Sequence, residues 1–254
     1  MSKLSCRSDQ FGDRMKRYEN VSRIYLPEKT PVIIRIDGKA FHTYTRGLEK
    51  PFSKDLSNIM WETTKFLCEN IQGCVLGYHQ SDEISLLLVN YKEVNTESWF
   101  KNNIQKMVSV SASLATAKFN ELSKNVFPHK GLAFFDSRVF VLPKEEVTNY
   151  FVWRQQDAIK NSISMVAQAN FPHKRLQGLN GKQMQELLFQ EKEIIWDDLE
   201  TWKKRGICLI KKEKDLGNVV RKKWEIDFEI PIFSQDRNYI ESLVYNKDES
   251  ETAV

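Results

Sequence analysis

The pattern of hydrophobic and polar positions predicts a run of alternating strands and helices. VIIRI (32–36) is β-branched and almost continuously apolar, which is typical of a central strand. Between residues 53 and 70, apolar side chains recur every three or four positions after Ser53. This spacing predicts an amphipathic helix with Ser53 as its cap.

The next segment reads as a hairpin, followed by one more helix and strand. CVLGY and ISLLLVNY are predicted to be its two strands, with HQSDE as the tight turn that carries Asp82 and Glu83. A helix is predicted from Glu97 to about Asn120, and a strand over 132–142. The resulting order is strand, helix, strand, strand, helix, strand.

This order predicts the fold class. It is the split βαβ, ferredoxin-like plan of an α+β protein, in which one antiparallel sheet has two helices on one face. In such a sheet the first strand lies beside the central hairpin. We therefore expect Asp37, at the end of VIIRI, to lie near Asp82 and Glu83.

The segments before and after this strand and helix pattern define the predicted domain organisation. SDQFGDRMKRYEN (8–20) is predicted to form a short helix that lies on the core. Residues 1–143 are interpreted as the catalytic core, and residues 144–245 as a helical and strand extension packed on it. In the extension we predict a long helix from Lys144, a helix that starts near Asn180–Gly181, and strands at GICLIKK and KKWEIDFEIPIF. The acidic tail 246–254 lacks an apolar pattern and is predicted to be flexible.

Composition and charge set limits on function. Of 254 residues, 41% are hydrophobic and 28% charged, which is typical of a soluble globular protein, and the formal net charge is only +4. Any nucleic-acid surface must therefore be local, and basic residues concentrate between 203 and 223, either as a solvated face or to bind phosphates. Four scattered cysteines without CxxC spacing argue against zinc and disulfides. No segment resembles a signal peptide or membrane span, so we expect a cytoplasmic protein.

The candidate chemistry lies in the strand-end acids. Asp37 is followed by Gly38, whose missing Cβ permits close approach of a metal or phosphate. Carboxylates from separate strands are the means by which proteins hold two Mg²⁺ ions about 3.5–4 Å apart for nucleotidyl transfer. Taken singly, each acid has a simpler interpretation: Asp37 as a turn residue, and Asp82 with Glu83 as a solvated pair.

Basic residues near these acids suit a triphosphate. Lys39, His42 and Arg46 follow Asp37 closely, although His42 is equally well interpreted as a loop histidine. His79 is interpreted as a structural residue. His173 lies in a loop with basic neighbours, and it is interpreted either as a phosphate contact or as a loop residue without a function. Neither a GxxxxGK[ST] nor a GxGxxG motif occurs, which excludes a Walker-type phosphate loop.

Five motifs, in their order and spacing, carry a family resemblance. RIDGKAFH, YHQSDEISLLL, WF…QKMVSVSASLAT, FDSRVFVLP and YFVWRQQDA resemble the tRNA-His guanylyltransferase superfamily over about residues 10–212. The resemblance implies nucleotide addition in the 3′-to-5′ direction at the 5′ end of tRNA. It also implies a polymerase-palm, ferredoxin-like core, two Mg²⁺ ions, ATP, GTP and other NTPs as substrates, and a homotetramer.

The resemblance also implies roles for single residues. The implied metal ligands are Asp37, the carbonyl of Gly38, and Asp82. The implied catalytic residues are Asp37, Asp82 and Glu83, with His42 needed for activation. The segments that match nucleotide-binding positions comprise Asp37, Gly38, Lys39, Ala40, Phe41, His42, Ser81, Asp82 and Lys106. Candidate tRNA contacts are Asn161, His173, Lys174 and Arg175.

One departure bears on the substrate. Where eukaryotic guanylyltransferases carry His-Ile-Asn-Asn-Leu-Tyr-Asn, this chain reads Ala-Ile-Lys-Asn-Ser-Ile-Ser from Ala158 to Ser164, and the histidine is absent. Its absence is typical of the bacterial and archaeal relatives that repair 5′-truncated tRNAs against the opposing strand. The sequence therefore predicts template-dependent repair. The alternatives are a tRNA-His-specific guanylyltransferase, a palm-fold nucleotide cyclase, and a non-catalytic tRNA-binding protein.

Overall fold

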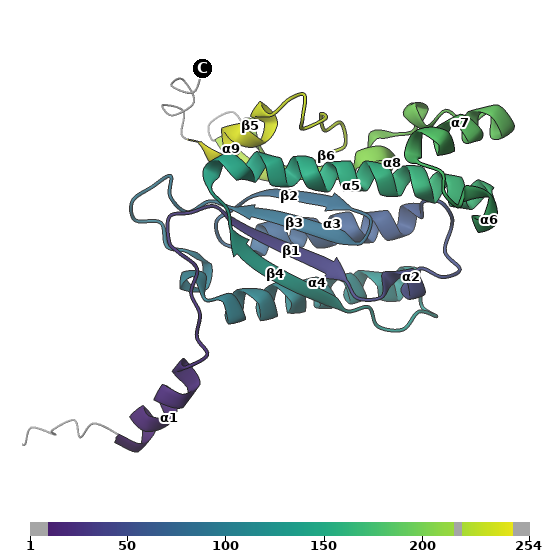
Figure 1. Cartoon of the computed structure of the whole chain (residues 1–254). Helices are drawn as coiled ribbons and strands as arrows, with labels where there is room; N and C mark the ends of the chain where they lie inside the picture. The colour runs from purple at the N-terminus through teal and green to yellow at the C-terminus, as the bar shows by residue number, and fades with distance from the viewer. Residues whose placement is uncertain (1–9, 216–219, 246–254) are drawn as a thin grey trace, which may run out of the picture.

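An antiparallel sheet forms the centre of the molecule. The computed structural model describes residues 10–215 and 220–245. The strand order within the sheet is β4-β1-β3-β2-β5-β6 (Figure 1). The strands are β1 (Val32–Gly38), β2 (Cys74–Gln80), β3 (Glu83–Leu88), β4 (Phe135–Val141), β5 (Ile207–Asp215) and β6 (Val220–Asp227).

Helices pack on both sides of this sheet or extend beyond it. The helices are α1 (Gln10–Asn20), α2 (Phe41–Tyr44), α3 (Lys54–Asn70), α4 (Ile104–Val126), α5 (Lys144–Asn170), α6 (His173–Leu176), α7 (Gly181–Lys192), α8 (Thr201–Arg205) and α9 (Asn238–Val244). Two short 3₁₀ turns are η1 (Trp99–Asn102) and η2 (Trp196–Asp198).

The first four strands confirm the predicted ferredoxin-like fold. Their order, β4-β1-β3-β2, is that of the split βαβ plan, and α3 and α4 lie together on one face. Successive side chains of β1 point to opposite faces. Ile34 and Ile36 therefore enter one core cluster with Met60 of α3 and Met107 of α4, whereas Ile33 enters a second cluster.

The second cluster lies beneath α5. Val147 and Phe151 of this helix pack with Ile33, and Tyr78 of β2 joins the same buried group. Strand β5 pairs with β2, and β6 pairs with β5, so the C-terminal strands extend the sheet that the first four strands begin. The division into parts 1–143 and 144–245 stays a prediction.

Two predicted helices differ from the structure. Helix α1 forms, but it stands away from the core without a buried residue, so the prediction that it lies on the core is wrong (Figure 1). Helix α4 begins at Ile104 instead of Glu97, because Asn103 caps it by accepting a hydrogen bond from the Lys106 amide. Phe100 and Lys101, just before it, have left-handed backbone that no helix continues.

Several strand ends also differ from prediction. β4 begins at Phe135 and not at Leu132, because the Asn120 side chain of α4 bonds both backbone groups of Ala133. β6 ends at Asp227, and the segment beyond it packs as irregular chain, where Gln155 bonds the amide of Phe233. The hairpin turn is only Ser81 and Asp82, so Glu83 already belongs to β3.

Two further expectations concern the C-terminal tail and membrane-spanning helices. The predicted flexible tail 246–254 lies outside the described residues. In the part of the chain that the structure describes, none of the helices has the length and apolar character needed to cross a lipid bilayer.

The close approach of β2 requires a glycine at position 206, which caps α8 and directly precedes β5. Its φ is +84°, and a Cβ there would lie 2.3 Å from the backbone oxygen of His79. We expect Gly206→Ala to lower the free energy of unfolding by about 2 kcal/mol or more, measured by urea denaturation. Gly131→Ala is the control, since nothing lies within 4 Å of its Cβ position. Equal stability of the two variants would contradict this explanation.

Candidate active site

The structure brings Asp37 and Asp82 together at one end of the sheet. Asp37 is the second-last residue of β1, and Asp82 lies in the turn between β2 and β3. The amide of Gly38 donates a hydrogen bond to the carbonyl of Asp82 at 3.1 Å, which ties the end of β1 to this turn. The predicted convergence of these two acids follows directly from the strand order.

The two acids repel each other. Burial, and next the negative charge of Asp37, raise the pKa of Asp82 to about 6. Folding therefore holds this carboxylate in surroundings that disfavour its ionised form. A cation between the two acids would remove that penalty.

The donors at this point fit a hard divalent cation. Carboxylate and carbonyl oxygens are the ligands that Mg²⁺ prefers, and Asp37, Asp82 and the Gly38 carbonyl supply them. Within the described ranges, no three acidic, histidine or cysteine side chains converge on one point. The protein therefore offers two carboxylates and a backbone oxygen, and leaves further positions to water or a phosphate.

An aromatic side chain fixes the turn after Asp37. A Cβ on Gly38 would lie 2.3 Å from the ring of Phe41, so only glycine permits this packing. The Phe41 ring is buried against the rings of Phe119 and Phe135, with centroids 5.4 and 5.1 Å away. The turn beside the acids is thus anchored in the core between the sheet and α4.

The remaining predicted nucleotide-binding residues near this turn are mostly accessible. Lys39, Ala40, His42 and Ser81 are exposed, and the His42 ring bonds the hydroxyl of Thr43 at 3.0 Å. Ala40 and Ser81 have left-handed backbone, with φ near 55°. Phe41 is the exception, because its buried ring leaves only its backbone for a ligand.

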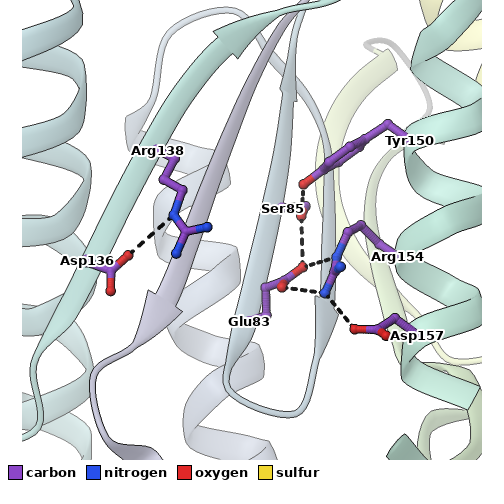
Figure 2. Close-up of polar contacts among 7 residues, drawn as sticks. All are labelled: Glu83, Ser85, Asp136, Arg138, Tyr150, Arg154 and Asp157. Carbon is purple, nitrogen blue, oxygen red and sulfur yellow. Dashed lines mark hydrogen bonds and ion pairs between the residues drawn. The ribbon is translucent and has the colours of Figure 1, made fainter. Parts of the chain in front are cut away.

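Glu83 has a partner that the sequence did not predict. Figure 2 shows its carboxylate facing Arg154 of α5, whose Nε and terminal nitrogen donate hydrogen bonds of 2.7 and 2.6 Å to the two oxygens. Both side chains are 7% exposed. Burial raises the pKa of Glu83, and the hydrogen bonds from Arg154 oppose that rise. Such a bidentate pair is a strong, directional contact.

Further groups complete this network. The Ser85 hydroxyl lies 2.8 Å from that of Tyr150, and Arg154 also reaches Asp157 at 3.1 Å (Figure 2). Both oxygens of Glu83 are therefore engaged in holding α5 on β3. The arrangement favours a positioning role for Glu83 over the catalytic role that the resemblance implies.

His79, predicted to be structural, supports the same turn. It is buried in β2, and its Nε2 donates a hydrogen bond to the carbonyl of Ser81 at 2.9 Å. Burial lowers the pKa of His79 to about 4, so its imidazole is neutral at physiological pH.

Lys106 is not brought to this site within one chain. It lies in the first turn of α4, where the preceding residues Asn103 and Ile104 bond the segment 24–26 that leads into β1. The acids lie at the other end of β1, near the C-terminus of α4. The assignment of Lys106 to a nucleotide site therefore stays a prediction, and one chain alone does not bring Lys106 to its own acid pair.

The candidate tRNA contacts lie farther along the chain. Asn161, His173, Lys174 and Arg175 are all exposed, the first on α5 and the others on α6. Arg175 pairs with Glu191 of α7. The structure thus shows that these side chains are accessible at this end of α5, and their contact with RNA stays a prediction.

Three arginines near the acids were missed by the sequence analysis. Arg35, Arg138 and Arg154 all point to the face of the sheet that α5 covers in part. A signal was present for Arg35, because it is the one charged residue in the apolar run VIIRI. The other two lie within FDSRVFVLP and YFVWRQQDA, without a periodicity that would indicate a role.

The fold and the acid pair define a class. A ferredoxin-like sheet that presents two adjacent carboxylates at the end of β1 and the β2–β3 turn is a palm-type nucleotidyltransferase arrangement. The sequence model of the Thg1 family, described as tRNAHis guanylyltransferase, matches residues 12–143. The chain belongs to this family, and it is a nucleotidyltransferase.

Solved structures and curated relatives agree with the assignment to this family. A bacterial tRNA(HIS) guanylyltransferase (Thg1)-like protein in complex with ATP is 61% identical with a TM-score of 0.87, covering 92% of this chain and 99% of that chain. A second such structure, in complex with GTP, is 57% identical with a TM-score of 0.84, covering 94% and 100%. The tRNA(His) guanylyltransferase of Schizosaccharomyces pombe is 30% identical over 211 residues, covering 77% of this chain and 78% of the relative.

Loss of Arg154 should destabilise the protein strongly. Arg154→Ala leaves Glu83 buried without its partner, so we expect the free energy of unfolding to fall by about 3–5 kcal/mol. Urea denaturation measures this. Asp157→Ala is the control, because it removes only the more exposed contact of Arg154 and should cost less than about 1 kcal/mol. Similar losses in both variants would contradict the central place of the Glu83–Arg154 pair.

The raised pKa of Asp82 gives a prediction with a definite sign. The ordinary value is 3.8 and the folded value about 6, so the penalty of ionisation is absent below the first and complete above the second. Asp82→Asn should therefore stabilise the metal-free protein by up to about 3 kcal/mol at pH 8, and by progressively less toward pH 4. Thermal denaturation at both pH values measures this.

The control for that measurement is Asp198→Asn, an exposed acid of η2. It changes the same charge outside the acid pair and should alter stability by less than about 0.5 kcal/mol. A stabilisation by Asp82→Asn that does not depend on pH would be incompatible with the raised pKa of Asp82, to which burial contributes most and Asp37 next.

Proposed function

We propose that this protein adds nucleotides in the 3′-to-5′ direction to the 5′ end of truncated tRNA, in a template-dependent reaction. An NTP first activates the 5′-phosphate, and the 3′-hydroxyl of an incoming NTP then attacks the activated end. The observation that carries the proposal is the adjacent pair Asp37 and Asp82, held beside exposed basic residues on a palm-type sheet.

The acids are proposed to hold magnesium. Asp37, Asp82 and the Gly38 carbonyl would bind it, and the raised pKa of Asp82 supports this because a cation would offset the repulsion. Two bound Mg²⁺ ions supply activation of an attacking oxygen and stabilisation of the leaving pyrophosphate. Lys39 and His42, exposed on the turn after Asp37, would contact triphosphate oxygens.

The nucleotides bound in two similar structures support the choice of nucleotide. The two bacterial Thg1-like proteins were solved with ATP and with GTP, at 61% and 57% identity to this chain. We infer that both nucleotides bind here, in the turn formed by residues 38–42 and Ser81.

Two features support tRNA as the partner. The stretch from Ala158 to Ser164 on α5 lacks the histidine of the eukaryotic guanylyltransferases, which favours repair over sole action on tRNA-His. On the β5–β6 hairpin, Lys212 lies directly opposite Lys223. Like charges in opposed positions weaken a sheet, and a bound RNA backbone would compensate for that cost.

We also propose the homotetramer that the resemblance implies. Lys106 lies at the far end of its own sheet from the acids, so it would contact a nucleotide only in the site of another copy. The tRNA-His-specific reaction remains the second candidate, because the curated relative from Schizosaccharomyces pombe is named for it.

One experiment tests the proposal. The protein is incubated with Mg²⁺, the four NTPs and either a tRNA of another identity that lacks its first nucleotide or full-length tRNA-His, and the added nucleotide is sequenced. We expect addition to the truncated tRNA, following the opposing base. Addition of G to tRNA-His alone would favour the second candidate, and no addition to either would overturn the proposal.

The same assay tests the acids. Asp37→Ala and Asp82→Ala should each lower the rate of addition by about a thousandfold or more, since metal stabilisation of the transition state contributes several kcal/mol. Asp198→Asn should leave the rate unchanged. Retention of most activity in either alanine variant would exclude these acids as the catalytic centre.

A further inference from the structure

One lysine ammonium gathers the backbone of a whole loop around it. The chain from residue 90 to residue 96, just after β3, forms neither helix nor strand. The Nζ of Lys29, which precedes β1, lies 3.0 to 3.2 Å from four backbone carbonyl oxygens of this loop, those of Asn90, Glu93, Val94 and Thr96. The loop therefore turns its carbonyl dipoles toward a single positive charge.

These four oxygens are more than a lysine can satisfy. An ammonium group has only three N–H donors, so four carbonyls at hydrogen-bonding distance must share them. A spherical cation has no such limit, and proteins bind K⁺ through backbone carbonyls that replace its hydration shell. None of the four ligands is a carboxylate, which Ca²⁺ and Mg²⁺ sites normally include. The set is therefore suited to a monovalent cation.

The backbone of Lys29 is unfavourable for a residue with a long side chain. Its φ is 58°, in the left-handed region that glycine and asparagine adopt more readily. The turn that contains it is closed by the Thr30 hydroxyl, which donates a hydrogen bond to the Pro27 carbonyl at 3.0 Å. The contacts of the ammonium offset the cost of this conformation, so the side chain has a task beyond solvation.

The surroundings favour a positive charge and leave room for it. A surface hollow of about 270 Å³ adjoins the ammonium, and its lining includes Glu28 and Glu97. Their negative charges attract a cation, whereas Lys101, on the same lining, opposes one. Without the stem of Lys29, the hollow would admit a cation together with its remaining water ligands.

The loop joins parts of the chain that other contacts also hold together. The Leu26 amide donates a hydrogen bond to the carbonyl of Asn102 at 3.0 Å, and the buried Asn102 side chain donates one to the Pro27 carbonyl at 2.9 Å. Lys29 adds the contacts to residues 90–96. The segment before β1 is thus fixed against the whole stretch that leads from β3 to the start of α4.

We propose that the loop 90–96 is a binding site for a monovalent cation of the size of K⁺ or NH₄⁺, and that the Lys29 ammonium occupies it permanently in this chain. A tethered cation holds the loop closed at any salt concentration, whereas a chain without it would take K⁺ or NH₄⁺ from solution. The inference does not rest on the proposed function, because β3 meets this loop at the end of the sheet opposite to Asp37.

The first measurement is amide hydrogen exchange of the loop in the full-length protein, with choline chloride as the only salt. Lys29→Ala should make exchange over residues 90–98 about tenfold faster or more, because the loop loses the charge that holds it. Lys101→Ala is the control: it removes an equal charge from the same hollow at a residue with φ of 51°, and should change exchange by less than about twofold. No acceleration in Lys29→Ala, or the same acceleration in both variants, would show that Lys29 does not hold the loop.

The second measurement replaces choline by K⁺, NH₄⁺ or Li⁺ at constant ionic strength, so that screening stays the same. K⁺ and NH₄⁺ should return exchange in Lys29→Ala to within about threefold of the unchanged protein. Li⁺ should restore much less, since it is too small to contact all four carbonyls, and the unchanged protein should not respond to the choice of cation. Equal protection by all three cations, or protection by none, would overturn the cation site.

A third measurement separates the charge from the backbone. Lys29→Gly removes the side chain and at the same time suits the left-handed φ. Its melting temperature should be about 2–4 °C higher in potassium chloride than in choline chloride, whereas that of the unchanged protein should differ by less than about 1 °C. Equal melting temperatures of Lys29→Gly in the two salts would contradict the proposal.

Discussion

Two carboxylates that repel each other are held side by side, and the surrounding structure maintains that arrangement. The β1–β3 ladder and the hydrogen bond from Gly38 to the Asp82 carbonyl fix the backbone on which both acids stand. The buried Phe41 ring fixes the turn on one side, and His79 supports the hairpin turn on the other. Stability is given up locally, as the raised pKa of Asp82 indicates, in return for a site that favours cations.

The charges around this pair fall into two groups. Glu83 and Arg154 neutralise each other in a buried, bidentate contact, so they join α5 to β3. Arg35 and Arg138 lie outside this contact: the Nε of Arg35 has no hydrogen-bond partner within the described residues, and the exposed Arg138 lies 3.9 Å from Asp136. The buried ion pair thus fixes a helix on the sheet, whereas the arginines of β1 and β4 contribute no comparable contact between elements.

Local periodicity was sufficient to predict the fold but not all of its contacts. The strand order followed from apolar runs and turn residues, and it brought Asp37 to Asp82 as predicted. The role of Glu83 was missed because Arg154 lies 71 residues away and α5 carries no spacing signal for that contact. The separation of Lys106 from the acids was not foreseen, because a family resemblance does not state at which end of the sheet the first turn of α4 lies. The docking of α1 failed for a related reason: amphipathic spacing shows that a helix has an apolar face, not what that face contacts.

The packing of Gly38 against Phe41 has an evolutionary consequence. The same ring belongs both to the core, through Phe119 and Phe135, and to the turn that carries the proposed nucleotide-binding residues. A change of volume deep under α4 would shift the turn, and would therefore alter substrate affinity as well as stability. The core residues under α4 and the residues of this turn therefore cannot change independently during evolution. Substitutions in the aromatic cluster are acceptable only in combinations that keep the ring of Phe41 in place.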